Sequence, residues 1–519
     1  MSKIETNRLY FGDNLTFLRN VEYFPNASVD LIYLDPPFNS NQVYNVIYRE
    51  PTGSDSSAQV KAFKDTWKWE DDAALALHEI NDHGRNAPPE LVGLLNTLEE
   101  FLGHVPMFAY LTQMSIRLLE LHRVLKSTGS LFLHCDPTAS HYLKLILDSI
   151  FGVKNFRNEI IWHYSGWNKR LESRIESRHD VILFYRKKQG ATFNYPTIPW
   201  MSKEEYVRIR KQKTYLDDEG REYVFSDAGS GKRVKRYIED AMAYGRPIDD
   251  VLVIDKLTSG EKEALGYPTQ KPVKLLRRIV EIGSNPGDVI LDPFCGCGTT
   301  IDAVESLNAD NPNSPRRRWV GIDLTHLAID LIKYRLAMRF ELGRGEYEVR
   351  GEPTTLNEAR SLAMEDRYQF QYWALGLIGA RPFGEEKKKG MDRGIDGYRS
   401  FLHGAQRTYE KCIVQVKSGR VSSPQIRDLK GAMLREKAEM AIFVTLEPET
   451  AEMRSEAASA GYYHSDIMNR DYPRIQILTI QTLLQHPDSL RIPPGGEIAR
   501  IEKYQGVEGG QNGLFKPVA

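Results

Sequence analysis

Residues 288–300 read DVILDPFCGCGTT, and this stretch decides the fold. The apolar run before Asp292 predicts a buried strand, and Thr299 begins a helical pattern. The glycines between them allow the backbone to pass close to a bound ligand. The segment RRWVGID, residues 317–323, follows as a second strand. A strand, glycine loop, helix and strand in this order are typical of a nucleotide-binding α/β fold.

The glycine loop lacks the third glycine of a dinucleotide-binding fingerprint, because Gly298 is followed by TTI. This argues against a nicotinamide or flavin enzyme. Asp323 ends the next strand, where a carboxylate can accept hydrogen bonds from both ribose hydroxyls. A tight turn followed by an ordinary aspartate is the alternative. Cys295 and Cys297 do not predict zinc, since no second Cys or His pair lies nearby.

The tetrapeptide Asp35-Pro36-Pro37-Phe38 follows the apolar run 29–34, which predicts a buried strand ending at a carboxylate. Ligands bind at this edge of open α/β sheets. The Asp35 carboxylate and the Pro36 carbonyl can each accept one hydrogen of an aromatic amine, which activates the nitrogen to attack a methyl sulfonium. Pro37 stiffens the loop, and Phe38 can stack on a base swung out of a duplex. A simple strand-ending turn is the alternative.

A polar region separates the predicted α/β units. Residues 107–126 have helical spacing, and SLFLHCD, residues 130–136, follows as a strand. From 164 to 265 the periodicity decays into a stretch dense in Lys, Arg and Gly, which we interpret as an inserted recognition region. Its basic side chains can contact DNA phosphates, which position DNA without specifying its sequence, although each one alone is better explained as a solvated charge. They are Lys169, Arg170, Arg208, Arg210, Lys211, Lys213, Lys232, Arg233, Lys235 and Arg236.

Four separated motifs together resemble those of the amino DNA methyltransferases. They are GDN at 12–14, DPPF at 35–38, TQKP at 269–272 and DPFCGCGTT at 292–300. The catalytic motif precedes the glycine loop, as in the permuted β group, in which the recognition region lies between the two halves. The resemblance covers roughly residues 1–345.

This resemblance implies S-adenosylmethionine as the methyl donor and double-stranded DNA as the partner. It implies that Asp13 lies near the adenine of the cofactor and that Thr269, Lys271 and Pro272 lie near its amino-acid end. Further cofactor contacts are expected at Asp292, Phe294, Gly296, Gly298, Thr299 and Asp323. A motif beginning with Asp is more typical of N6-adenine than of N4-cytosine methylation. Cys135 follows a histidine and not a proline, which disfavours a covalent cysteine mechanism.

A second candidate site lies downstream, where GIDG places Asp396 at the end of one strand and QVK places Gln415 and Lys417 on the next. Alternate residues of a strand share a face, so the three side chains can meet. Asp396 and Gln415 would bind Mg²⁺, and Lys417 would orient water or stabilise a pentacovalent phosphate. An amphipathic hairpin is the alternative. The pattern resembles the Mrr-type branch of the PD-(D/E)xK nucleases over roughly residues 366–485, and a further acidic ligand is not assigned.

The bulk composition fits this picture. With 519 residues, 41% hydrophobic and 27% charged, the chain predicts two or three soluble folding units. We expect a cytoplasmic protein without disulfides, because no membrane span or signal sequence is recognisable and only four cysteines occur. The formal charge of -1 means that DNA contacts must come from local basic patches. The oligomeric state stays open, a homodimer included.

The expected fold class is α/β: a Rossmann-like methyltransferase sheet with an inserted recognition region, plus a smaller restriction-endonuclease-like α/β domain. We expect a methyltransferase domain at 1–350, carrying the insertion 164–265, a nuclease-like domain at 351–495 and a flexible tail at 496–519. The expected function is N6-adenine methylation of duplex DNA with Mg²⁺-dependent cleavage, in restriction and modification. Two alternatives remain: an N4-cytosine methyltransferase whose C-terminal domain only binds DNA, and an RNA methyltransferase.

Overall fold

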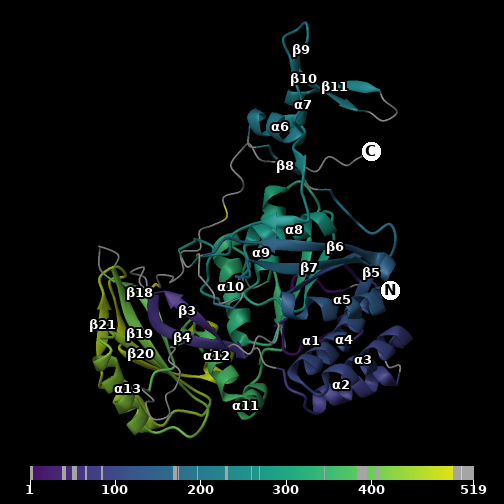
Figure 1. Cartoon of the computed structure of the whole chain (residues 1–519). Coiled ribbons are helices and arrows are strands. Elements are labelled where there is room, and N and C mark those ends of the chain that lie inside the picture. Colours follow the sequence, from purple (N-terminus) through teal and green to yellow (C-terminus); the bar gives the residue numbers. More distant parts are fainter. Residues whose placement is uncertain are drawn as a thin grey trace.

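A nine-stranded sheet forms the centre of the larger part of the protein (Figure 1). The computed structural model describes residues 4–37, 43–49, 55–64, 67–82, 86–166, 172–173, 175–195, 197–200, 202–227, 232–258, 260–267, 269–343, 345–382, 394–403, 408–494 and 504. In spatial order, the strands of this sheet are β13 (Val251–Val253), β6 (Phe156–His163), β7 (His179–Arg186), β5 (Leu125–Cys135), β2 (Val29–Leu34), β14 (Val289–Asp292), β15 (Arg318–Asp323), β1 (Arg8–Phe11) and β16 (Glu348–Arg350).

The sheet is mostly parallel, which confirms the expected α/β class. Among its described strands, β7 alone runs antiparallel to its two neighbours, β5 and β6. Every residue of β2 is buried, as expected for a central parallel strand covered on both faces. Side chains alternate between the faces, so Ile32 and Leu34 join one apolar core while Leu31 and Tyr33 join the other.

Helices cover both faces of this sheet (Figure 1). One layer contains α1 (Asn14–Arg19), α2 (Asp71–Asn81), α3 (Pro89–Leu102), α4 (Pro106–Val124) and α5 (Pro137–Phe151). The opposite layer contains α8 (Val273–Gly283), α9 (Thr299–Asp310) and α10 (His326–Phe340). No described helix is both long and apolar enough to cross a membrane.

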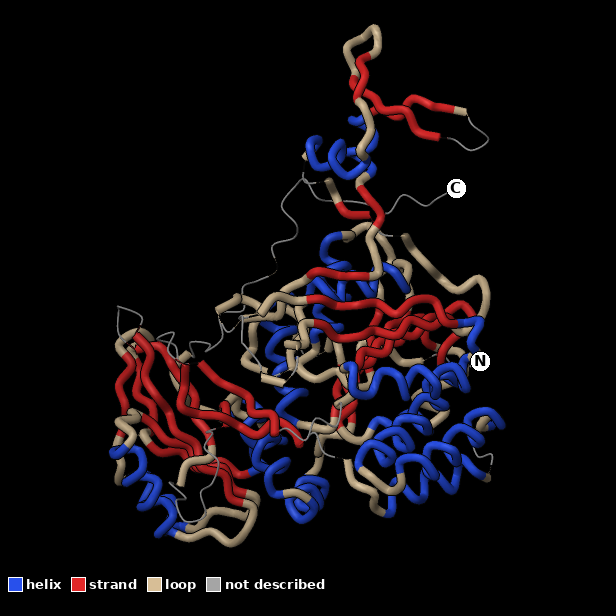
Figure 2. Tube along the Cα trace, in the orientation of Figure 1, coloured by secondary structure: helices blue, strands red, loops and turns tan. Residues whose placement is uncertain are grey.

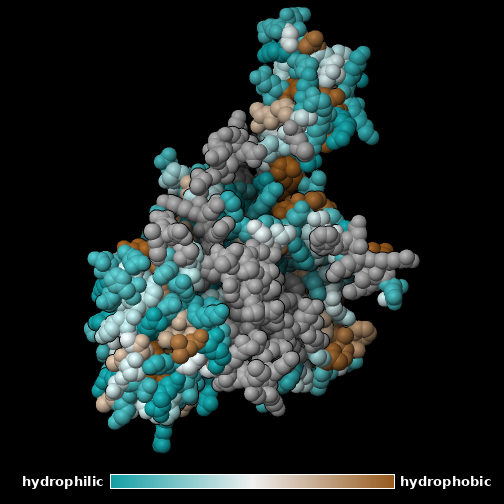
Figure 3. All heavy atoms as spheres, turned by 90° about the vertical axis from the view of Figure 1, so that its left-hand side faces the viewer, coloured by the Kyte–Doolittle hydropathy of each residue, from teal (hydrophilic) through white to brown (hydrophobic). Residues whose placement is uncertain are grey.

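An arm projects from the body (Figures 1 and 2). It is built from β8 (Thr197–Ile198), α6 (Lys203–Arg210), β9 (Thr214–Leu216), β10 (Glu222–Asp227), β11 (Arg233–Tyr237), α7 (Ile238–Tyr244) and β12 (Arg246–Pro247). On the face that Figure 3 shows, hydrophilic side chains cover most of this arm. The expected insertion 164–265 is wider than the arm and needs correction, because β7 and β13 fall inside it yet belong to the central sheet.

The C-terminal part has its own five-stranded sheet, with apolar cores on both faces. In spatial order its strands are β17 (Arg381–Pro382), β18 (Gly397–His403), β19 (Thr408–Lys417), β20 (Met440–Thr445) and β23 (Ile475–Thr479). The helices of this part are α11 (Leu356–Glu365), α12 (Arg367–Leu377), α13 (Ser423–Arg435), α14 (Ala451–Ala458) and α15 (Ile480–Gln485). Two hairpins complete the described strands: β3 (Val43–Arg49) with β4 (Asp55–Lys64), and β21 (Tyr462–Ser465) with β22 (Arg470–Pro473).

Candidate active site

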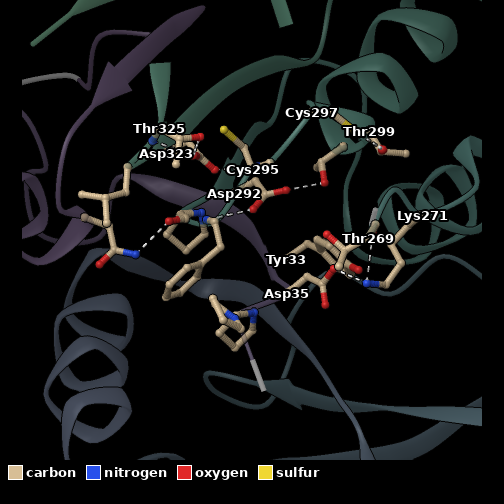
Figure 4. A pocket seen from close by; sticks show the side chains of 18 of the residues that line it. Tyr33, Asp35, Thr269, Lys271, Asp292, Cys295, Cys297, Thr299, Asp323 and Thr325 are labelled. Carbon is tan, nitrogen blue, oxygen red and sulfur yellow. Dashed lines mark hydrogen bonds and ion pairs between the residues drawn. The ribbon is translucent and has the colours of Figure 1, made fainter. Parts of the chain in front are cut away.

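A cavity of about 320 Å³ lies at the carboxyl edge of the central sheet (Figure 4). Asp35 follows β2, Asp292 ends β14, Asp323 ends β15 and Gly12 follows β1, and all four residues line the cavity. Parallel strands bring their carboxyl ends to one edge, so motifs far apart in sequence meet here. The Asp-Pro-Pro turn and the glycine loop therefore face the same space, which is large enough for a small-molecule ligand.

The Asp-Pro-Pro turn forms one wall of the cavity. Asp35 is mostly buried and forms an ion pair with the Nζ of Lys271, which comes from the loop before α8. Pro36 and Pro37 line the same wall. Phe38 lies outside the described residues. The Asp35 carboxylate and the residue Pro36 are thus neighbours in the wall of the cavity.

The glycine loop forms the opposite wall and is fixed by two carboxylates. Asp292 accepts hydrogen bonds from the Phe294 amide at 3.1 Å and the Thr300 hydroxyl at 2.5 Å. Asp323 accepts one from the Gly296 amide at 2.9 Å. Burial raises the pKa of Asp292 to about 7 and that of Asp323 to about 6, although these hydrogen bonds act in the opposite direction.

The glycines of this loop have distinct structural roles. Gly296 and Gly298 have positive φ angles of 49° and 77°, which favour glycine. A Cβ on Gly298 would lie 2.7 Å from Cγ1 of Ile332, so no side chain fits there. A Cβ on Gly296 would approach the Tyr267 ring to 3.4 Å. The loop therefore passes close to the cavity because it carries no side chains at these positions.

The Gly-Asp-Asn motif is tied to this loop and to α4. Asn14 Nδ2 donates to the carbonyl oxygen of Pro293 at 2.8 Å. Arg117 of α4 donates to Asn14 Oδ1 at 2.8 Å and forms a 2.8 Å ion pair with Asp13. Arg117 is buried and lines the cavity, although its sequence context is an apolar helix. The only sequence signal for Arg117 was an arginine within an apolar helix, and we did not predict from it that Arg117 belongs to the site.

Most of the predicted methyltransferase residues line the cavity. They are Asp13, Asp35, Pro36, Pro37, Thr269, Lys271, Asp292, Phe294, Gly296, Thr299 and Asp323. Pro272 and Gly298 cap α8 and α9 instead and do not line it. The lining residues that we did not predict are Tyr33, Trp67, Arg117, Tyr267, Gln270, Leu276, Cys295, Cys297, Thr300, Leu324 and Thr325. Gln270, Cys295, Cys297 and Thr300 lie within the quoted motifs, although no role was assigned to them. Arg117 was marked only as an arginine in an apolar helix, and the remaining residues carry no chemical signature in the sequence.

A second cavity, of about 360 Å³, lies in the C-terminal part and is lined by Asp396 and Lys417. Asp396 Oδ2 accepts a hydrogen bond from the Val416 amide at 2.7 Å. Gln371 of α12 also lines the cavity and was not predicted. Gln415 is buried and does not line it, so the predicted trio is only partly brought together.

Asp396, which lines this second cavity, and the buried Gln415 next to Val416 of its lining offer oxygens compatible with a hard cation. Gln415 Oε1 is buried without a hydrogen-bond partner among the described residues, which is the kind of oxygen that a cation would satisfy. Asp396 supplies a carboxylate, and Mg²⁺ commonly keeps several water ligands. No group of three or more His, Cys, Asp or Glu side chains within the described ranges could hold a metal.

Comparisons with known proteins divide the chain into the same two parts, the larger N-terminal part and the C-terminal part. A family model described as DNA methylase matches residues 29–334, and a model described as restriction endonuclease matches residues 362–484. The Type III restriction-modification enzyme StyLTI Mod subunit of Salmonella typhimurium is 25% identical over 364 residues, 60% of this chain and 51% of that protein. Type II methyltransferase M.EcaI of Enterobacter cloacae is 26% identical over 348 residues, 57% of this chain and 73% of that protein.

The match therefore spans about half of the Salmonella protein's length. Among solved structures, a candidate DNA modification methylase of Thermus thermophilus, complexed with S-adenosyl-L-methionine, matches with a TM-score of 0.34 and 20% identity. That match covers 67% of this chain and 99% of the Thermus chain.

Proposed function

The chain belongs to the DNA methylase family, and from this membership we propose that it transfers a methyl group from S-adenosylmethionine to the N6 amine of adenine in duplex DNA. One observation carries the proposal: the Asp-Pro-Pro turn and the glycine loop line one cavity at the edge of the sheet. The wall formed by the Asp-Pro-Pro turn carries hydrogen-bond acceptors for an amine. The wall formed by the glycine loop has room for a nucleoside beside its glycines and carries the Asp323 carboxylate, which can accept hydrogen bonds from ribose.

In the proposed reaction, the Asp35 carboxylate and the Pro36 carbonyl accept the two hydrogens of the amine. Accepting them withdraws the nitrogen lone pair from the ring and stabilises the positive charge that develops. S-adenosylmethionine, when bound, supplies a methyl group on a positively charged sulfur. Lys271 balances the charge of Asp35 until the amine arrives, because the two side chains form an ion pair.

We favour adenine over cytosine because the catalytic motif begins with Asp35 and not with serine. N4-cytosine methylation and RNA methylation remain the alternatives. Transfer of a labelled methyl group into duplex DNA, single strands and RNA, followed by mass spectrometry of the nucleosides, distinguishes all three. N4-methylcytosine as the product would refute the adenine assignment.

Asp35→Ala tests the catalytic assignment. We expect it to abolish methyl transfer, because the amine loses its charged acceptor, while the fold and cofactor binding persist. Single-molecule mapping of modified bases measures the first effect, and thermal melting with and without S-adenosylmethionine measures the second. Retained transfer by a folded Asp35→Ala protein would contradict the mechanism.

We propose in addition that the C-terminal part cleaves DNA in a Mg²⁺-dependent reaction, with Asp396 and Gln415 near the metal and Lys417 near the scissile phosphate. The cavity that brings Asp396 and Lys417 together supports this assignment, as does the buried, unpaired Gln415 oxygen. A domain that binds DNA without cutting it is the alternative.

Lys417→Ala tests the cleavage assignment. We expect it to remove nicking and cutting of unmethylated DNA while methylation continues, because the two cavities are lined by different residues. Lys411→Ala, on the same strand but outside the second cavity, is the matched control and should still cut. Equal nicking by wild type and Lys417→Ala would remove the nuclease assignment.

A further inference from the structure

Three side chains behind the acceptor wall form a hydrogen-bonded chain that the mechanism above does not use. Tyr33 Oη lies 2.9 Å from Nδ1 of His134, and Nε2 of His134 lies 3.2 Å from Oδ2 of Asp180. These residues lie on the adjacent strands β2, β5 and β7. His134 is fully buried, and Trp162 packs edge-on against its ring. The histidine at the centre of this hydrogen-bonded chain is therefore shielded from water.

The polarity of this chain follows from Asp180. Burial opposes its ionisation, but the hydrogen bond with His134 and the positive charges of Lys271 and Lys256 act the other way and keep the pKa of Asp180 below its usual value. An ionised carboxylate only accepts hydrogen bonds, so Nε2 of His134 must carry a hydrogen. In the neutral ring Nδ1 is then an acceptor, and it receives the hydroxyl hydrogen of Tyr33.

Tyr33 connects this hydrogen-bonded chain of side chains to the cavity at the carboxyl edge of the central sheet. It lines the cavity, and it stands near the end of β2, two positions before Asp35, which lines the same cavity. Burial and the nearby charges of Asp35, Asp292 and Asp180 raise the pKa of Tyr33 well above its usual value, so the phenol stays protonated. Because His134 engages the hydroxyl hydrogen, the oxygen offers lone pairs to a donor. Asp35 is less available as a base, since Lys271 is paired with it.

We propose that Tyr33, His134 and Asp180 form a proton relay that receives the proton released by the acceptor amine. The relay rests on the proposed methyl transfer. As the new N–C bond forms, the S–C bond breaks and sulfur keeps the electron pair. Of the two protons that the methylated nitrogen carries, the one that Asp35 accepts as a hydrogen bond moves on to Tyr33 Oη, while the hydroxyl proton of Tyr33 moves to His134 Nδ1. The resulting imidazolium is stabilised by the Asp180 carboxylate, and after product release the proton returns through Tyr33 to water in the cavity.

In this relay Tyr33 is the member that lines the cavity, His134 takes up the proton from Tyr33, and Asp180 acts as the positioning residue. Tyr33→Phe keeps the ring and removes only the hydroxyl. We expect its single-turnover rate of methyl transfer to fall about 10- to 100-fold, at the lower end of general acid–base effects, with unchanged S-adenosylmethionine affinity. The solvent deuterium isotope effect on that step should fall to about one.

Tyr10→Phe is the matched control. Tyr10 is a fully buried tyrosine of β1 in the same sheet, lies outside the cavity and has no hydrogen-bond partner for its hydroxyl within the described residues. It should transfer at the wild-type rate with the wild-type isotope effect. A Tyr33→Phe protein with those same two properties would overturn the relay alone. A wild-type protein that transfers no methyl group would overturn both the relay and the proposed function.

A readout that does not depend on activity is the tautomer of His134. Nitrogen-15 NMR of the histidine-labelled protein should place a hydrogen on Nε2 and leave Nδ1 unprotonated, and Asp180→Asn should disturb that tautomer. A purely structural histidine has no reason to lose transfer rate and tautomer together in Asp180→Asn. Observation of the Nδ1–H tautomer in the wild-type protein would overturn the relay, because Tyr33 could not then donate to His134.

Discussion

Asp323 shows how a single carboxylate can set the conditions under which this protein holds its cofactor. It ends β15 beside the glycine loop, and burial raises its pKa to about 6. Only the ionised form offers full acceptor capacity to two ribose hydroxyls. Protonation in the mildly acidic range should therefore weaken the cofactor contact that we propose for this residue.

We predict that S-adenosylmethionine affinity is nearly constant above pH 7 and falls towards tenfold for each pH unit well below 6. Isothermal titration calorimetry between pH 5 and 8 measures this dependence. Asp323→Asn should bind more weakly at neutral pH and should lose most of the dependence. An unchanged profile in Asp323→Asn would assign the titration to another group.

Folding stability should respond to Asp323 with the opposite sign. Its folded-state pKa lies above the ordinary value of 3.8, so the carboxyl group favours folding when protonated. That contribution is complete below about pH 3.8 and is lost as the pH rises through about 6. Ionised Asp323 is therefore an unfavourable element of the free protein, which cofactor contacts can offset.

Individual site residues were predictable where chemistry and position agree. Asp35 was predictable because a carboxylate followed by two prolines directly after a buried strand has few purely structural uses. Arg117 was not, because its role depends on how α4 packs against the Gly-Asp-Asn turn. Alternation along β19 placed Gln415 and Lys417 on one face, yet only Lys417 reaches the second cavity. The alternation of side chains shows which face of a strand a residue occupies, but it does not show how deeply that residue is buried.

At the scale of elements, α12 lies between the two cavities. One side of this helix contacts α10, where Gln369 Oε1 accepts a hydrogen bond from the His326 amide at 3.1 Å. Tyr372 packs against the apolar cluster that contains Tyr267 and Cys297, two residues that line the cavity at the edge of the central sheet. Gln371, on the same helix, lines the second cavity. The packing of α12 on α10 therefore joins the walls of both sites.

Gly376 is the residue that permits this close packing. A Cβ at this position would lie 2.1 Å from Oδ2 of Asp330 on α10, which is too close for any side chain without movement. We predict that Gly376→Ala destabilises the protein by about 1–3 kcal/mol, the usual cost of overpacking. Thermal and denaturant unfolding of the full chain measure the change.

Gly431→Ala is the matched control, because Gly431 also lies within a helix, α13, but a Cβ there meets nothing within 4 Å. Alanine has the higher helix propensity, so this variant should be neutral or stabilised by up to about 1 kcal/mol. If both substitutions had the same effect, the contact between α10 and α12 would not be the reason for glycine at 376.

The sequence predicted which strands and helices form more accurately than it predicted the residues at which they begin and end. We expected a strand to begin near Gly129, but β5 begins at Leu125 and runs through this glycine. A Cβ on Gly129 would lie 2.8 Å from the Asp30 carbonyl oxygen of β2, so glycine serves close strand pairing here and not a turn. β7 was placed in the insertion because a short apolar run beside polar stretches does not reveal its partner strand.

At the scale of the whole molecule, Tyr504 is the one described residue of the stretch 496–519 that we expected to be flexible, and it contacts the methyltransferase body. Its amide donates to the Arg339 carbonyl oxygen at 2.9 Å, and its hydroxyl donates to Asp310 at 2.7 Å and accepts from Arg277 at 2.9 Å. A tail rich in glycine gave no sign of such a contact. Contacts between distant segments depend on tertiary geometry, which local composition does not encode.

The arm carries an exposed basic strand. The overall charge is only -1, so attraction to DNA must be local. On β11, Arg233, Lys235 and Arg236 are exposed, and the Lys235 Nζ lies 4.6 Å from the centre of the Tyr223 ring. An exposed strand that carries three cations is well suited to contact the phosphate backbone.

We predict that replacing Arg233, Lys235 and Arg236 together by Gln weakens DNA binding and lowers the slope of log Kd against log salt concentration by about 2 to 3, since each phosphate contact contributes close to one. Fluorescence anisotropy with labelled duplexes at several salt concentrations measures the slope. S-adenosylmethionine affinity and thermal stability should not change, because the arm has its own small core around Trp200, Tyr206 and Val224, and the three side chains lie outside it. An unchanged slope would mean that DNA is held elsewhere on the protein and that these charges serve only solvation.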